Sequence, residues 1–166
     1  MVGSGNITES FLLDARRTMI ELITDNYFGH VQKLAHENGT IVVSEVLCPT
    51  MISDGVEFYK NVDWTGSEFW VRASQNWKPN DIADSVAGAR LYGKKVIYSE
   101  AYTGGSWQDH PFGLKAMGDY HYTAGVNRIM FHVWNEQYIP DARPGIPGAG
   151  TPFNHLNTWW NASCGA

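Results

Sequence analysis

Apolar residues recur at roughly helical spacing in three segments of the chain. The spacing predicts helices over residues 7–37, 80–92 and 111–124. The pair Asn38 and Gly39 is a typical stop at the end of the first segment. Pro111 suits the first turn of the third, where its missing N–H costs nothing. We therefore expect three helices joined by shorter elements.

A short apolar run follows each predicted helix. These runs predict strands over residues 41–47, 96–102 and 129–134. Residues 62–64 are a fourth, weaker strand candidate, and residues 65–70 are expected to form a polar and aromatic loop. Alternating helices and strands are typical of a parallel sheet with helical cover. The predicted fold class is α/β, a parallel half (β/α)8 TIM-type barrel of about four βα units.

The chain has 166 residues, fewer than the roughly 250 of a whole (β/α)8 barrel. We expect residues 1–5 to be a non-native linker and residues 6–166 to form a single domain. A half barrel leaves two strand edges that tend to pair with another chain. The expected partner is therefore a second copy, in a homodimer that completes the barrel.

Composition narrows the classes of ligand. Asp and Glu number 17 against 12 Lys and Arg, and no basic run predicts nucleic-acid binding. No apolar run reaches 18 residues, so no membrane partner is expected. Cys48 and Cys164 fit free thiols better than a bridge, and no His or Cys spacing predicts zinc. Secreted, periplasmic and cytoplasmic locations all stay open.

Carboxylates lie at or just after the ends of the predicted strands. Glu45 and Glu100 end two of them, and Glu68 lies in the predicted loop. Because the carboxyl ends of parallel strands face the ligand crevice, these positions favour chemistry. Hydrolysis of a glycosidic bond uses two carboxyl groups. The candidate catalytic residues are therefore Glu45, Glu68 and Glu100, although a glutamate at a strand end also fits a capping or ion-pairing role.

Aromatic and polar neighbours would suit a sugar site, because an indole or phenol ring covers the C–H face of a pyranose. The candidate substrate-binding residues are Asp63, Trp64, Trp70, Tyr102, Trp107, His132 and Trp134. Asp63 also fits a role in orienting its own loop, and His132 fits a buried histidine with satisfied ring nitrogens. His121, on the third predicted helix, is expected at the surface.

Five sequence blocks, in order, resemble glycoside hydrolase family 106, the α-L-rhamnosidase-like enzymes. The blocks are DWTGSEFW at 63–70, SEAYT at 99–103, PFGLK at 111–115, GVNRIMFH at 125–132 and NHLNTWW at 154–160. The resemblance implies a (β/α)8 catalytic barrel that cleaves α-L-rhamnosides with inversion, and a calcium ion near the sugar. It also implies that Glu68 acts as general base and Glu100 binds the sugar or the calcium, with exchanged roles as the alternative. The residues themselves require no cofactor.

Three other interpretations stay open. The resemblance also fits a wider group of retaining barrel glycosidases, whose nucleophilic glutamate lies on the seventh strand, the position that Glu100 takes if residues 129–134 are the eighth. The chain could instead be a carbohydrate-binding remnant without turnover, or an inactive barrel fragment.

Overall fold

The computed structural model of the chain describes residues 5–45, 54–71, 79–104 and 109–132. Helices and strands alternate through most of this length, as the hydrophobic pattern predicts. In chain order the elements are α1 (Asn6–Glu21), the π-helix η1 (Leu22–Phe28), α2 (Gly29–Glu37), β1 (Val43–Glu45), the 3-10 helix η2 (Glu57–Asn61), β2 (Trp64–Trp70), α3 (Pro79–Leu91), β3 (Ile97–Thr103), α4 (Pro111–Ala124) and β4 (Arg128–Phe131).

The four strands form one parallel sheet in the order β1-β2-β3-β4. Each strand thus pairs with its neighbour in sequence, which is the arrangement of successive βα units in a barrel. The α/β class and the parallel sheet are confirmed, and the sheet is consistent with half of a barrel. Completion of the barrel by a second copy stays a prediction.

The prediction for residues 62–70 was wrong. The strand candidate at 62–64 shares only Trp64 with the true strand, and the predicted loop at 65–70 lies within β2, which pairs with both β1 and β3. Gly66 and Ser67 are poor strand formers by propensity, but tertiary context overrides it here. The Ser67 hydroxyl lies 3.1 Å from that of Ser99 on β3, buried in the sheet.

Helices α3 and α4 cover one face of the sheet. Successive side chains of a strand point to opposite faces, and on this side Ile97 and Ile129 pack against a buried cluster from α3 and the turn before β4. The cluster consists of Ile82, Val86 and Val126. We call this side of the sheet the helix face. Because helices cover it, a site on the sheet would lie on the opposite side.

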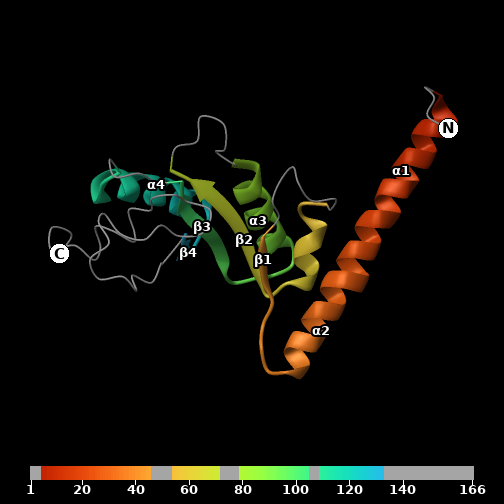
Figure 1. Cartoon of the computed structure of the whole chain (residues 1–166), viewed down its shortest axis with the longest axis horizontal. Coiled ribbons are helices and arrows are strands. Elements are labelled where there is room, and N and C mark those ends of the chain that lie inside the picture. Colours follow the sequence, from red (N-terminus) through yellow and green to blue (C-terminus); the bar gives the residue numbers. More distant parts are fainter. Residues whose placement is uncertain (1–4, 46–53, 72–78, 105–108, 133–166) are drawn as a thin grey trace, which may run out of the picture.

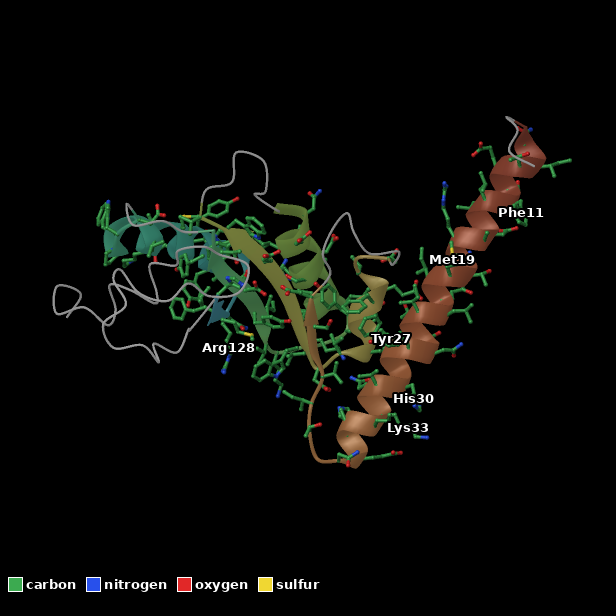
Figure 2. All side chains as sticks on the ribbon, in the orientation of Figure 1. Phe11, Met19, Tyr27, His30, Lys33 and Arg128 are labelled. Carbon is green, nitrogen blue, oxygen red and sulfur yellow. The ribbon has the colours of Figure 1, made fainter. Side chains whose placement is uncertain are left out.

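The N-terminal helical region runs from Asn6 to Glu37 and ends before Gly39, whose φ of 69° suits glycine. Only its second half packs on the rest, through Phe28 of η1 against Phe58 and Tyr59 of η2. Helix α1 runs away from the sheet and has no buried residue (Figure 1). Phe11 is exposed on it (Figure 2), yet no described helix has the length and apolar character needed to cross a membrane.

Candidate active site

Three glutamates lie on the face of the sheet opposite the helix face. Glu68 of β2 pairs in register with Glu100 of β3, and Glu45 of β1 pairs with Gly66, two residues before Glu68. Residues in register on parallel strands point to the same face, as do residues two apart on one strand. We call this side the carboxylate face. It brings together the three acids that the sequence predicts as catalytic.

Glu68 is nearly buried, with 7% of its surface exposed. The indole N–H of Trp70, two residues along the same strand, donates a hydrogen bond of 2.5 Å to Glu68 Oε1. An indole nitrogen can only donate, so Glu68 Oε1 is the acceptor of this bond. Trp70 therefore fixes the position of the Glu68 carboxyl group.

Glu100 has different neighbours. The hydroxyl of Thr103 lies 3.4 Å from Glu100 Oε1, and His132 Nε2 lies 3.7 Å from the same oxygen. A hydroxyl both donates and accepts, so Thr103 can contact either protonation state of the carboxyl group. His132 follows β4 directly and is held there by its backbone N–H, which donates to the Ala101 carbonyl. Two adjacent carboxylates thus have chemically distinct surroundings.

Tyr98 lies near two of the acids, Glu45 and Glu100. Its ring lies over Gly66, where an added Cβ would be 2.3 Å from Tyr98 Cζ. Burial raises the pKa of the Tyr98 phenol, and the negative charges of Glu45 and Glu100 raise it further. The phenol therefore stays protonated on the carboxylate face, as a neutral group among acids.

The candidate Tyr102 points the other way. Trp70 pairs with Thr103, whereas Phe69 pairs with Ala101, so Tyr102 is an extra residue in β3 and has a φ of 67°. Its ring is buried on the helix face with Phe69, at a centroid distance of 5.0 Å. The bulge interrupts the regular alternation of side chains along β3. Tyr102 is placed as a core residue, away from the carboxylates.

Asp63 and Trp64 lie at the opposite end of the sheet from Glu68, at the start of β2. Asp63 accepts hydrogen bonds from the backbone N–H of Val42 at 2.7 Å and from Gln32 at 3.3 Å, and it pairs with His36 at 3.0 Å. Burial alone raises the pKa of Asp63, but these partners outweigh it, and the net pKa lies below the usual 3.8. This network fits a role in holding the helical region to the sheet.

Trp64 contacts a cation at that same amino-terminal end. The guanidinium of Arg128 lies 4.9 Å from the centre of the Trp64 ring, within range of a cation–π interaction. Arg128 begins β4, at the lower edge of the sheet in Figure 2. The contact separates Trp64 from the carboxylates by most of the length of β2.

Four residues named in the sequence analysis lie outside the described part of the chain, and His121 lies in the core. Trp107, Trp134, Cys48 and Cys164 lie outside the described residues. His121 is not at the surface as expected. It is 1% exposed and stacks on Phe69 at 3.7 Å, because it falls on the side of α4 that packs against the sheet.

The implied calcium ion finds no ready-made site in the described part of the chain. No group of three or more His, Cys, Asp or Glu side chains there could hold a metal ion, whereas calcium takes six to eight oxygen ligands. Glu68 and Glu100 alone do not form such a site. Calcium binding therefore stays a prediction from the family resemblance.

Parallel βα units with paired carboxylates at the C-terminal ends of strands are typical of barrel glycosidases. A family model described as alpha-L-rhamnosidase matches residues 1–164. The chain therefore belongs to glycoside hydrolase family 106. It is also 36% identical over 162 residues to a protein of Formosa agariphila named "Putative beta-glucuronidase". The match covers 96% of this chain and 14% of that protein, so the chain spans about one seventh of its relative.

Proposed function

We propose that the carboxylate face is part of the active site of an inverting, α-L-rhamnosidase-like glycoside hydrolase. The register that places Glu45, Glu68 and Glu100 on one face carries this proposal. Membership of family 106 supports the activity. The β-glucuronidase name of the relative belongs to a protein seven times longer, so it makes a glucuronide the second sugar to test.

The spacing of the acids suggests their roles. Neighbouring strands lie about 4.8 Å apart, and two residues along a strand add about 6.6 Å, so the backbones at Glu45 and Glu68 are about 8 Å apart. Inverting enzymes separate their two carboxyl groups by about 6.5–9.5 Å, which leaves room for the attacking water. We assign Glu68, positioned by its hydrogen bond from Trp70, as the base that takes a proton from this water.

Glu45 is then the acid that protonates the departing glycosidic oxygen. Glu100 is the immediate neighbour of Glu68 in register, and the backbones there are about 4.8 Å apart. At that spacing the two carboxyl groups can face the same bound sugar. Glu100, beside Thr103 and His132, is therefore assigned to hydrogen-bond the sugar hydroxyls.

Leaving-group dependence separates the three roles. Glu68→Gln should lose turnover on every aryl glycoside, because water is no longer activated. Glu45→Gln should keep activity on a dinitrophenyl glycoside, whose leaving group needs no proton, and lose it on an alkyl glycoside. Glu100→Gln should mainly raise KM.

Glu37→Gln is the matched control, because Glu37 is an exposed helix residue 3.9 Å from Lys33. The panel should include nitrophenyl α-L-rhamnoside and β-glucuronide. Turnover that survives both Glu45→Gln and Glu68→Gln would refute the carboxylate assignment. Sugar binding without any turnover would favour a carbohydrate-binding role.

We further propose that a second copy supplies the missing strands of the barrel. Both β1 and β4 are edge strands of the described sheet, and Val43 and Phe131 on them are 40% and 57% exposed. Unpaired edges of this kind pair readily with further strands. Light scattering at micromolar concentration should give a dimer, and a cooperatively melting monomer would refute this proposal.

A further inference from the structure

We propose that Tyr102 is a positioning residue, which sets the Thr103–Glu100 contact on the carboxylate face from the helix side of the sheet. The inference rests on the proposed function only for its kinetic readout. Its structural basis is the bulge in β3. At this bulge Tyr102 points to the helix face, and the next residue, Thr103, points to the carboxylate face.

The bulge changes which residues share a face. In a regular strand, residues three apart point to opposite faces, so Thr103 would point away from Glu100. The extra residue Tyr102 restores Thr103 to the carboxylate face, where it pairs with Trp70 and its hydroxyl reaches Glu100 Oε1 at 3.4 Å. Without the bulge this contact could not form.

Tyr102 adopts an unfavourable backbone conformation. Its φ of 67° is in the left-handed region, which is unfavourable for a residue with a Cβ. No other described non-glycine residue has a positive φ. The side chain must therefore make contacts that outweigh this cost.

Those contacts come from the helix face. The Tyr102 ring packs at right angles to Phe69 and stacks with Phe131 at 5.6 Å. Its hydroxyl lies against Gly118 of α4, where an added Cβ would be 2.5 Å from the oxygen. A glycine at this point of α4 makes room for the hydroxyl, so the helix, the bulge and Glu100 form one connected series of contacts.

Substitutions at Gly118 test this connection without touching the carboxylate face. Gly118→Ala should push on the Tyr102 hydroxyl, and Tyr102→Phe should relieve it, because the next ring atom, Cζ, lies 3.7 Å from the added Cβ. Gly113→Ala on the same helix is the matched control, since its Cβ would meet only His110, at 3.7 Å or more.

The first readout does not depend on catalysis. The methyl resonance of Thr103 is recorded by NMR with and without Glu100→Gln. The resonance should respond to Glu100→Gln in the otherwise unchanged chain and in the Gly113→Ala control. It should stop responding in Gly118→Ala and respond again in the Tyr102→Phe/Gly118→Ala double variant. An equal response in all four backgrounds would overturn the proposal.

Two further measurements deal with a variant that does not fold and with catalysis. If Gly118→Ala does not fold, the double variant decides, and a folded double variant with no Thr103 response overturns the proposal. Thr103→Val should raise KM about tenfold for the best glycoside, while the melting temperature of the protein stays unchanged. Thr103→Ser, which keeps the hydroxyl, should restore the wild-type KM. A chain without turnover refutes the proposed function alone, because the NMR response of Thr103 still decides the role of Tyr102.

Discussion

The contact between Gly66 and Tyr98 gives a prediction that can be worked out from the structure. A Cβ at position 66 would lie 2.3 Å from Tyr98 Cζ and 2.5 Å from its hydroxyl. Tyr98 is 5% exposed, so its ring has little room to move. Overpacking of this kind typically costs about 1–3 kcal/mol, while alanine in place of glycine in a strand gains roughly 0.5–1 kcal/mol.

Gly66→Ala should therefore lower the free energy of unfolding by about 1–2 kcal/mol. For a chain of this size that corresponds to a fall in melting temperature of roughly 3–6 °C. Urea and thermal unfolding, followed by circular dichroism, measure both quantities. Gly113→Ala is the matched control, because its added Cβ would make only ordinary contacts, and it should melt like the wild type.

A double-mutant cycle identifies the cause. In the Tyr98→Val background the ring is gone, so Gly66→Ala should be neutral or slightly stabilising there. The same destabilisation in both backgrounds would show that Tyr98 is not what the new Cβ meets. Wild-type stability of Gly66→Ala itself would refute the packing described for the carboxylate face.

Three further predictions concern titration and stereochemistry. Burial lowers the pKa of His121 below its usual 6.5, so stability should fall as pH falls below that value, by at most about 1.4 kcal/mol per pH unit; His121→Phe should flatten this part of the urea-midpoint profile. The pKa of Asp63 is lowered, so its contribution to folding stability is present above pH 3.8 and is lost as pH falls further. Asp63→Asn should lower the free energy of unfolding by about 1–2 kcal/mol at neutral pH, and this difference from the wild type should vanish in acid. The sugar released by the enzyme should have the inverted configuration by NMR, and a retained anomer would move the catalytic pair to Glu68 and Glu100.

The sequence predicted best those elements whose periodicity matches their packing. The helices over 80–92 and 111–124 and the strand over 96–102 lie within one residue of their observed bounds. Each carries an apolar pattern that tertiary structure reinforces. Strand β2 lacked this signal, because its helix face has the small polar side chains Thr65 and Ser67, which are buried against the neighbouring strand and helix.

The placement of the candidate site residues was predicted in part, for a related reason. The strand-end rule found Glu45 and Glu100, and it found Glu68 as an acid in a loop just after a predicted strand, although Glu68 lies within β2. Which residues surround each acid depends on register and on the bulge, and no local pattern encodes either. The bulge reversed the expected direction of Tyr102, and it gave Thr103 a place beside Glu100 that alternation along a regular strand would forbid.

The geometry of the acids is consequently a property of the whole sheet. Glu68 and Glu100 are neighbours because β2 and β3 pair in this register, and two glycines help to maintain that pairing. Gly66 admits the Tyr98 ring on the carboxylate face, and Gly118 admits the Tyr102 hydroxyl on the helix face. Substitutions at either glycine change no charge, yet we expect them to displace groups beside the acids. Loss of function at these positions would therefore separate the placement of the carboxylates from their chemistry, which replacement of the glutamates cannot do.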